Sequence, residues 1–360
     1  MATVTSSIGT SSRDYSTIAA WEADIANIAN NGDDVIGECY NDSVFSDINV
    51  HINISGLIPA TVTLTAPESE RHDGTAGSGV RIQAGASASY MMRINEASSV
   101  GTVEWLEFDG QDQDINRYFQ TDGSGTKTAI CRKCIFHNLM KTTSGQFTII
   151  DMGFTSTAAS TSFLNNIIYD SGSAHTVTAP AYGIYIDNVC TVVVSNNTIY
   201  DWKNDNGSGL CYGIYALVDD AKHSIRNNII TGPKDGTSSG TELAINMSAG
   251  TTNVTIDYNA VDDTSSIGAN SIDNVDPDDC FVSTVGGSED LHQKAGSPLI
   301  GQGVDLGTTD GVNFDIDEYD RDANGVTWDI GAHQFIAGAV SLIKRSFTRG
   351  VLRGYRRGMI

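Results

Sequence analysis

Four segments of the chain superimpose without gaps: FLNNIIYD (163–170), VSNNTIYD (194–201), IRNNIITG (225–232) and IDYNAVDD (256–263). A second register keeps step with them in YGIYID (182–187), YGIYAL (212–217) and LAINMS (243–248). Looser copies begin at residues 103 and 133, and in the latter Cys134 takes the place of the shared Asn. The shared positions lie 31 residues apart and are Asn166, Asn197, Asn228 and Asn259. A constant period of this length is typical of repeat architectures.

The repeated segments have the composition of strands. They are short, rich in β-branched and aromatic residues, and bounded by turn residues, and Ile48, Val50 and Ile52 alternate with polar residues. No helical pattern separates the copies, so each strand must return to stack on the previous one. We therefore predict an all-β fold, a parallel β-solenoid with coils of about 31 residues over residues 33–290.

The Asn pairs predict the corners between strands. Asn tolerates left-handed backbone better than β-branched residues do, so it suits a sharp turn. Corners that stack about 4.8 Å apart, the spacing of paired strands, allow the side-chain amides to form a hydrogen-bonded ladder. We expect such a ladder along Asn166, Asn197, Asn228 and Asn259.

With its Asn corners, the chain resembles the right-handed parallel β-helix superfamily, which includes pectate-lyase-like proteins and phage tailspikes. The stretch from RDYST (13–17) through AAWE (19–22) to GECYND (37–42) is similar to the start of β-helix proteins encoded in phage genomes. SPLIGQGVDLG (297–307), DIDEYDR (315–321) and WDIGAHQF (328–335) resemble a terminal module common in β-helix proteins. The resemblance implies a right-handed coil and is weak evidence for any activity.

Both ends of a solenoid need protection against end-to-end pairing. Residues 1–32 are expected to supply a capping helix with Ser16 as N-cap and an apolar stripe at Ile18, Trp21, Ile25 and Ile28. Residues 291–335 are expected to form a C-terminal closing module. There the resemblance implies that carboxylates such as Asp315 and Asp329 bind Arg321 and close the last coil.

Charge divides the chain into two parts. The sequence has 44 Asp and Glu against 21 Lys and Arg, yet residues 336–360 contain six bases and no acid. We predict that this segment is a basic attachment tail, whose arginines, glycines and apolar residues recur every four positions. Its expected partner-binding residues are Lys344, Arg345, Phe347, Arg349, Val351, Arg353, Tyr355, Arg356 and Arg357.

Composition and the chain start lead to an expected location. There is no apolar run of the roughly 20 residues that span a bilayer, and no pattern of a secretory signal at the start. Abundant Gly, Ser, Thr and Asn without an export signal favour a virion protein, released by lysis. The acidic body repels a phosphate backbone, so we do not expect nucleic acid as a partner. A homo-oligomer is expected, a trimer by analogy with tailspikes.

Few motifs carry chemistry. In VDDAKHSIRNN (218–228), carboxylates can hold a cation and a neighbouring base can abstract a proton, as a polysaccharide lyase requires, although a loop and outward strand positions explain the same residues. The catalytic candidates are Asp219, Asp220, Lys222, His223 and Arg226.

Two further patterns leave alternatives open. DRDANG (320–325) places Asp320, Asp322 and Asn324 as in a calcium loop, without the acid expected at its twelfth position, and an ionic clasp is the competing interpretation. Cys131 and Cys134 form a CxxC pair with no second pair at zinc-finger spacing. Tyr182, Tyr185, Tyr212 and Tyr215 either stack as structure or present rings to sugars.

These observations favour a non-enzymatic structural protein of a phage particle, in the capsid or tail, anchored by residues 336–360 to virion subunits and in contact with host glycans. The alternative is a β-helix polysaccharide lyase or glycoside hydrolase acting on an acidic or cell-surface polysaccharide. No cofactor other than calcium is expected.

Overall fold

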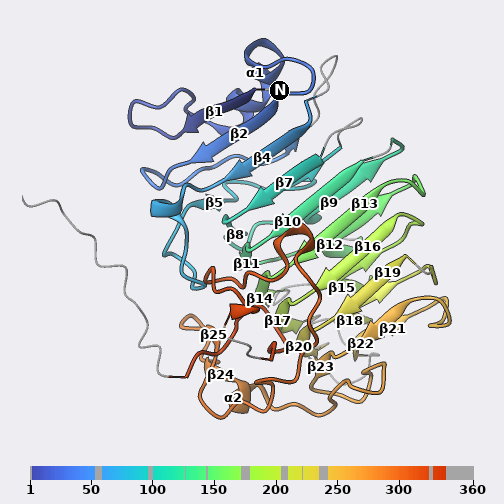
Figure 1. Ribbon diagram of the computed structural model, residues 1–360. Helices are drawn as coiled ribbons and strands as arrows, with labels where there is room; N and C mark the ends of the chain where they lie inside the picture. The colour runs from blue at the N-terminus through green and yellow to red at the C-terminus, as the bar shows by residue number, and fades with distance from the viewer. Residues whose placement is uncertain are drawn as a thin grey trace, which may run out of the picture.

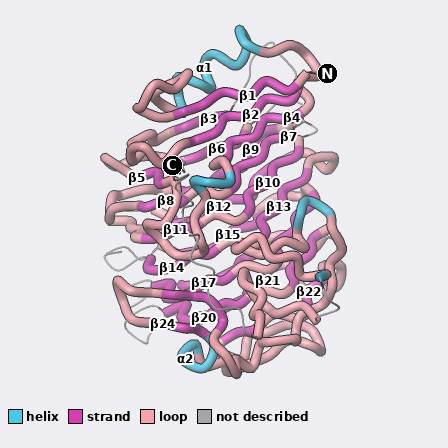
Figure 2. Tube along the Cα trace, turned by 60° about the vertical axis from the view of Figure 1, so that its left-hand side comes forward, coloured by secondary structure: helices cyan, strands magenta, loops and turns pink. Residues whose placement is uncertain are grey.

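A computed structural model describes residues 2–52, 59–95, 100–125, 127–142, 145–171, 179–203, 210–220, 222–234, 242–323 and 327–337. The predicted attachment tail begins at 336, and from residue 338 onward it lies outside the described residues, as do all nine of its partner-binding candidates. The strands stack in one column, seen from two sides in Figures 1 and 2.

Three parallel sheets form the walls of the column. Sheet A consists of β1 (Thr3–Ile8), β2 (Asp34–Cys39), β4 (Thr61–Thr65), β7 (Val100–Glu104), β10 (Thr128–Arg132), β13 (Ser160–Leu164), β16 (Thr191–Ser195), β19 (His223–Arg226) and β22 (Thr255–Asp257). Sheet B consists of β5 (Arg81–Gln83), β8 (Glu107–Asp109), β11 (Ile135–His137), β14 (Ile167–Ser171), β17 (Thr198–Lys203), β20 (Ile229–Lys234) and β23 (Ala260–Val261). Sheet C consists of β3 (Val50–Ile52), β6 (Met92–Ile94), β9 (Arg117–Gly123), β12 (Phe147–Phe154), β15 (Ala181–Ile186), β18 (Cys211–Ala216) and β21 (Glu242–Met247).

From β4 to β21, the chain visits the sheets in the order A, B, C in every coil. The strand register repeats the sequence period: Ile167 pairs with Thr198, and Thr198 pairs with Ile229. The second predicted register is equally regular, because Ile184 pairs with Ile214 and Ile214 with Ile245 in sheet C. The all-β parallel solenoid is thereby confirmed.

The interior of the column is filled by side chains stacked from coil to coil. Phe108 stacks on Phe136 with ring centroids 4.8 Å apart, and Phe136 contacts Phe163 at 6.0 Å. All three side chains are fully buried. Each inward position therefore meets its own repeat in the next coil, which makes the core continuous along the whole column.

The corner between sheets A and B contains the predicted Asn ladder. Asn166 Nδ2 donates to Asn197 Oδ1 (3.1 Å), Asn197 Nδ2 to Asn228 Oδ1 (3.0 Å), and Asn228 Nδ2 to Asn259 Oδ1 (2.9 Å). Asn166 Oδ1 also accepts from the backbone N–H of Cys134 (2.9 Å), so the ladder reaches the coil in which Cys replaces Asn.

The two residues of each Asn pair have different tasks. The second Asn forms the ladder, whereas the preceding residue adopts the left-handed backbone, with φ of 55°, 56° and 59° at Asn165, Asn196 and Asn227. Lys133 and Tyr258 take the same conformation at the equivalent place in other coils, with φ of 54° and 57°. The corner geometry is thus kept even where the residue suits it poorly.

The predicted helix near the start is α1 (Ile18–Ile28), beside β1, β2 and β3 at the end of the column where the chain begins (Figure 1). Thr17, not Ser16 as predicted, is its N-cap, because Thr17 Oγ1 accepts from Ala20 N (3.1 Å). Trp21 is fully buried against β2, where a Cβ on Gly37 would lie 2.7 Å from the indole ring.

The C-terminal segment lies along the side of the column. It contains α2 (Pro277–Cys280), the hairpin of β24 (Phe281–Ser283) and β25 (Asp290–Gln293), and the 3₁₀ helix η2 (Thr309–Gly311). A further 3₁₀ helix, η1 (Glu68–Glu70), follows β4 earlier in the chain. Figure 1 shows the final part of the C-terminal segment in red crossing in front of several coils. A second apolar core joins it to the outer face of sheet B and includes Ile135, Ile167, Ile229, Phe281, Leu291, Leu299, Ile316 and Ile330.

Candidate ligand-binding surface

The predicted catalytic residues on and before β19 are occupied by structural contacts. Asp219 accepts from the backbone N–H groups of residues 252, 253 and 254, which belong to the following coil. Asp220 accepts from Lys222 N, and Lys222 Nζ donates to Thr157 O (3.0 Å). These contacts fasten neighbouring loops to one another and leave the three side chains without a common target.

The other two members of that set point to different places. His223 is buried inside the column, with Nε2 3.1 Å from Cys190 O. Arg226 lies at the end of β19 and donates from Nε to Ser224 Oγ (3.0 Å). His223 and Arg226 lie three residues apart on β19 and point to opposite sides of the sheet, because successive side chains of a strand alternate between its two faces.

The predicted calcium loop forms a local turn. Asp320 Oδ1 accepts from Asn313 Nδ2 and from Asp322 N (both 3.1 Å), and Asp322 Oδ1 accepts from the indole N–H of Trp328 (2.9 Å). Asn324, the third candidate ligand, lies outside the described residues.

Arg321 is buried as the resemblance implied, and Asp315 and Asp329 act on it through their charge, while its hydrogen bonds go to other groups. Its guanidinium donates to the backbone oxygens of Asp329 (3.3 Å) and Gly331 (2.8 Å), to Gln334 Oε1 and to Asn165 Oδ1 (both 3.3 Å). Asn165 belongs to a middle coil. Arg321 therefore fastens the C-terminal segment to the side of the column at a middle coil.

The CxxC pair lies inside the column. Cys131 and Cys134 are both fully buried, and Cys131 Sγ lies 3.9 Å from Asn166 Oδ1. Burial raises the pKa of the Cys131 thiol. A buried neutral thiol is a poor metal ligand and packs as a small apolar group, so this pair belongs to the core.

The outer face of sheet C is not part of the second apolar core, which lies between the C-terminal segment and sheet B. Strand register aligns one outward residue of each strand in a row across this face. The row runs through His51, Arg93, Gln120, Asp151, Tyr185, Tyr215 and Asn246. Charged residues thus adjoin aromatic ones along a single line.

Four tyrosines form the aromatic part of this face. Tyr182 pairs with Tyr212 and Tyr185 with Tyr215 across β15 and β18, with parallel rings 5.8 Å and 5.9 Å apart. Tyr182 also contacts Tyr185 at 4.8 Å. Tyr182 and Tyr212 are buried beneath their neighbours, whereas Tyr185 and Tyr215 are partly exposed. The expectation that the rings stack as structure is confirmed, and two of the rings also present surface.

Glycines make this arrangement of the rings possible. A Cβ on Gly183, between the two tyrosines of β15, would lie only 2.5 Å from the backbone oxygen of Gly213 in the next coil. The close backbone approach requires glycine at that place. YGIY in successive coils therefore encodes a paired aromatic surface.

Asp151, on β12, lies beside the tyrosines. Arg117 Nε forms a short ion pair with its Oδ2, and Gln120 Nε2 donates to the same oxygen (3.3 Å). Its other oxygen, Oδ1, is buried and has no hydrogen-bond partner among the described residues. Burial, opposed by Arg117 and reinforced by Asp187, raises the pKa of Asp151 to about 6.

Asp187 is the second acid of this group. A Cβ on Gly153 would lie 3.2 Å from Asp187 Oδ1 and 3.5 Å from Asp151 Oδ1, so both carboxyls reach the same glycine. Burial also raises the pKa of Asp187, while a hydrogen bond from Asn188 opposes the shift. Two acids with raised pKa values in one place can hold a proton at mildly acidic pH.

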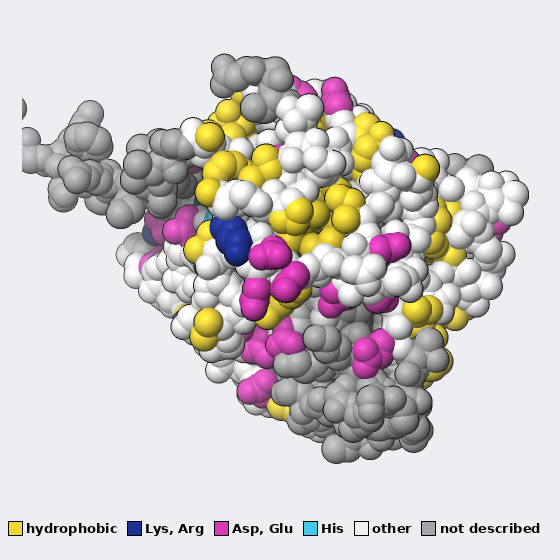
Figure 3. Space-filling model, turned by 90° about the horizontal axis from the view of Figure 1, so that it is seen from below, with side chains coloured by type: hydrophobic (Ala, Val, Ile, Leu, Met, Phe, Trp, Pro, Cys, Tyr) yellow, Lys and Arg dark blue, Asp and Glu magenta, His cyan; other side chains and the backbone are white. Residues whose placement is uncertain are grey.

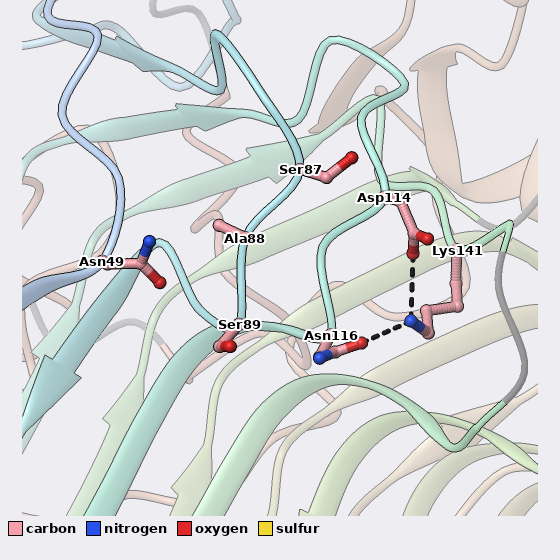
Figure 4. Close-up of a pocket in the computed structure, with 7 residues that line it drawn as sticks. All are labelled: Asn49, Ser87, Ala88, Ser89, Asp114, Asn116 and Lys141. Carbon is pink, nitrogen blue, oxygen red and sulfur yellow. Dashed lines mark hydrogen bonds and ion pairs between the residues drawn. The ribbon is translucent and has the colours of Figure 1, made fainter.

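A polar hollow of about 380 Å³ opens where the chain enters sheet C. Figure 4 shows Lys141 reaching from one side to Asp114 (3.0 Å) and to Asn116. Amides and hydroxyls complete the lining, which consists of Asn49, Ser87, Ala88, Ser89, Asp114, Asn116 and Lys141. Asn116 directly precedes Arg117, so the hollow adjoins the charged part of the row.

The end of the column near β23 has a different character. Figure 3, which views the molecule from that end, shows acidic and hydrophobic side chains intermixed and few basic ones. This agrees with the formal charge of −23. In the described parts of the chain, no helix is both long and apolar enough to cross a membrane.

Comparison with models of known protein families, with curated proteins and with solved structures found no match for this chain. The class of protein is therefore defined by its architecture alone, as a parallel β-solenoid. The repeat identified the tyrosines as candidates, but Asp151 and Asp187 were not predicted as site residues. These two acids lie 36 residues apart in segments outside the Asn motif. The sequence does contain one signal for Asp151. This residue lies 34 residues before Tyr185, close to the repeat length, so it could have been placed one coil before that tyrosine.

Proposed function

We propose that this protein is a non-enzymatic structural solenoid of a virus particle that binds a glycan along the outer face of sheet C. The observation that carries the binding proposal is the tyrosine set of β15 and β18, with two rings buried and two partly exposed. Aromatic rings combine an apolar face with a polar hydroxyl, which suits the apolar C–H face and the hydroxyl groups of a sugar.

The neighbouring groups support the same ligand class. Arg117 and Gln120 contact Asp151, which pairs with Tyr185, and the hollow next to Arg117 adds the amides and hydroxyls that saccharide hydroxyls require. The row also crosses many coils, so an oligosaccharide can contact several of them. Rigidity favours binding, because a preformed surface loses little conformational freedom.

The virion setting rests on sequence. The body is strongly acidic while residues 336–360 are basic, which is the asymmetry of an interaction tail. We propose that this tail attaches the solenoid to capsid or tail subunits and that the chain forms a trimer. Removal of residues 336–360 should abolish association with the particle and leave the solenoid folded, and association that survives the truncation would contradict the attachment role.

Binding is tested on an array of neutral and acidic oligosaccharides. We expect Tyr185→Ala and Tyr215→Ala to weaken binding of any retained glycan at least tenfold, which corresponds to about 1.4 kcal/mol. Tyr40→Ala, which removes an aromatic ring next to Arg13 on a different part of the column, is the matched control. Wild-type protein that retains no glycan would contradict the proposal.

A second candidate function is glycoside hydrolysis at the same face. It is favoured by one specific observation, the paired carboxyls of Asp151 and Asp187 with raised pKa values. Glycosidases use two carboxyl groups, one of which must carry a proton near neutral pH. Hydrolysis would be established if new reducing ends were released from a bound glycan and this release were lost in Asp151→Asn and Asp187→Asn. Glycan that stays intact after prolonged incubation would show that the face only binds it.

A further inference from the structure

Two histidines and an aspartate from separate parts of the C-terminal segment converge beside β25. His292 Nε2 lies 3.2 Å from Asp317 Oδ1, and His333 Nε2 lies 3.2 Å from Asp317 Oδ2. The two rings meet edge to face with centroids 4.7 Å apart. The side chains are 18%, 31% and 15% exposed for His292, Asp317 and His333, so a small ion can reach them.

The spacing of these atoms matches that of metal ligands. Zinc binds imidazole nitrogen and carboxylate oxygen at about 2.0–2.2 Å, which places neighbouring ligand atoms roughly 3.0–3.5 Å apart. Both nitrogen–oxygen distances of 3.2 Å fall in that interval, and the three donor atoms all lie within 4.8 Å of one another. An ion can therefore replace the two hydrogens that bridge the rings to Asp317 with little movement.

The surroundings of His292 favour the same use. Its other nitrogen, Nδ1, contacts Asp290 Oδ1, which holds the ring with Nε2 directed at Asp317. A carboxylate on the distal nitrogen is a common outer partner of metal-bound histidine. A Cβ on Gly74 would lie 2.6 Å from His292 Nε2 and 3.0 Å from Asp317 Oδ1, so only glycine, with φ of 83°, leaves this space beside the two ligand atoms free of a side chain.

The local charge is also suited to a cation. Asp290 and Asp317 flank His292, and the fully buried Asp315 lies two residues from Asp317. Arg321, the buried cation nearest to Asp315, has its guanidinium directed at neutral oxygens. A divalent ion would offset the excess of carboxylates.

A second group of similar composition serves as a contrast. Glu107 is fully buried and bonded to His137 Nε2 (2.8 Å) and Gly77 N (2.6 Å). Asp109 receives hydrogen bonds from Gln83, Gln111 and Asn138. Both carboxylates already accept hydrogen bonds from protein donors, and all three side chains are buried, so we assign this group to stabilisation of the fold.

We propose that His292, Asp317 and His333 bind a divalent transition-metal ion, with Zn²⁺ the best match, and that the ion ties β25 to the end of the C-terminal segment. Two imidazoles and one carboxylate with water in the remaining position form a ligand set that zinc accepts. This site is distinct from the Asp320 loop and from the outer face of sheet C, so it does not depend on glycan binding.

Binding of the ion changes the protons that both histidines carry. His292 releases its Nε2 proton to solvent. It keeps the proton on Nδ1, which remains hydrogen-bonded to Asp290 Oδ1. His333 Nδ1 now accepts from Gln293 N (3.1 Å), so its proton must move from Nε2 to Nδ1 when Nε2 binds the ion. This shift breaks the bond from Gln293, and His333 is therefore the weaker of the two nitrogen ligands.

The test is a titration of metal-free, full-length protein with ZnCl₂ by calorimetry, and with CoCl₂ by visible absorption. We expect one ion per chain and a rise in the melting temperature of the wild type with Zn²⁺. His292→Gln and Asp317→Asn should abolish binding, and Asp290→Asn should weaken it about 10- to 100-fold, as loss of an outer partner does. His51→Gln, on sheet C, is the control and should bind as the wild type does.

Several outcomes would overturn this site. One is a wild-type protein that gives no heat of binding with Zn²⁺ and no visible absorption with Co²⁺. Another is metal binding that stays unchanged in both His292→Gln and Asp317→Asn. Binding that is lost in Asp320→Asn but kept in His292→Gln would place the ion in the other loop. If His292→Gln fails to fold, the imidazole ligands are counted instead on the wild type from the paramagnetically shifted imidazole N–H resonances of its Co²⁺ form, and fewer than two imidazoles would reject the proposal.

Discussion

Each Asn of the ladder satisfies four buried polar groups at once. Asn197 Oδ1 accepts from the backbone N–H and from the side-chain amide of Asn166, while Asn197 Nδ2 donates to Phe163 O and to Asn228 Oδ1. Every donor and acceptor of the amide is therefore used inside the column. No other side chain of this size supplies two donors and two acceptors in this geometry.

Asn197→Ala should strongly destabilise the solenoid, because it leaves these buried groups without partners. An unsatisfied buried group costs about 1–3 kcal/mol, so we expect a loss on the order of 3 kcal/mol or more in the free energy of unfolding. Urea unfolding followed by circular dichroism measures it. Asn188→Ala, at a partly exposed site next to β15, is the control, and an equal effect of both variants would refute the ladder as a main source of stability.

Asp151 gives a pH dependence with a definite sign. Its pKa is raised to about 6 in the folded protein, from roughly 3.9 in an unfolded chain. The folded state thus binds this proton more tightly, so the stabilising contribution is complete below pH 3.9 and is lost as pH rises through about 6.

Asp151→Asn removes this ionisation. Relative to the wild type, the variant should gain stability between about pH 4 and pH 7, on the order of 2 kcal/mol, despite losing the ion pair with Arg117. Chemical unfolding at several pH values gives the difference. Asp14→Asn is a counter-test, because hydrogen bonds from Ser7 lower the pKa of Asp14 and the slope should have the opposite sign. A pH-independent difference for Asp151→Asn would contradict the shift.

Helix α1 depends on one close contact with the first coils. Trp21 is fully buried on Gly37 of β2, together with Ile18 and Ile25 from the same side of the helix. The apolar stripe was readable from its spacing of three and four residues. The need for glycine in the facing strand was not, because it arises from where the indole ring lies.

Gly37→Ala should displace the helix. The added Cβ would lie 2.7 Å from the indole, so Trp21 must move, and overpacking of this kind costs about 1–3 kcal/mol. Tryptophan fluorescence and thermal unfolding report the change. Gly85→Ala is a matched control, because the nearest heavy atom to its added Cβ lies 4.0 Å away. An unchanged melting temperature for Gly37→Ala would show that α1 is only loosely attached.

The molecule as a whole is a column whose C-terminal segment covers the outer face of sheet B and part of the outer face of sheet A. Sheet B is packed on the interior and again on the C-terminal segment through the second apolar core. The segment also contacts the Asn corners, because Val312 O accepts from both Asn165 Nδ2 (3.2 Å) and Asn196 Nδ2 (3.1 Å). Stability therefore combines contacts between neighbouring coils with a strap that spans several of them.

Arg321→Ala should loosen this strap before the column unfolds. The change removes four hydrogen bonds and leaves Asp315 and Asp329 buried without the nearby cation, which typically costs about 3–5 kcal/mol. Hydrogen exchange should then accelerate in residues 297–335 while the Asn ladder stays protected. Arg13→Ala, at a partly exposed ion pair with Asp42, is the control. Uniform acceleration along the whole chain would contradict a separable strap.

The sequence alone determined the coil. The 31-residue recurrence of Asn, the alternation of apolar residues and the YGIY repeat are local patterns that repeat because each coil meets the same neighbours. For that reason the fold, the ladder and the second register were predictable. The candidate sites were not, because Asp151 and Asp187, or His292, Asp317 and His333, share no motif.

Only the tertiary structure decided what the non-repeating residues do. The C-terminal segment folds back along the column, because its apolar residues match the outer face of sheet B and part of that of sheet A. The same fold-back brings His292, Asp317 and His333 together, and coil stacking brings Asp151 beside the tyrosines. Periodic contacts can be read from spacing, whereas contacts between distant segments depend on how whole surfaces fit.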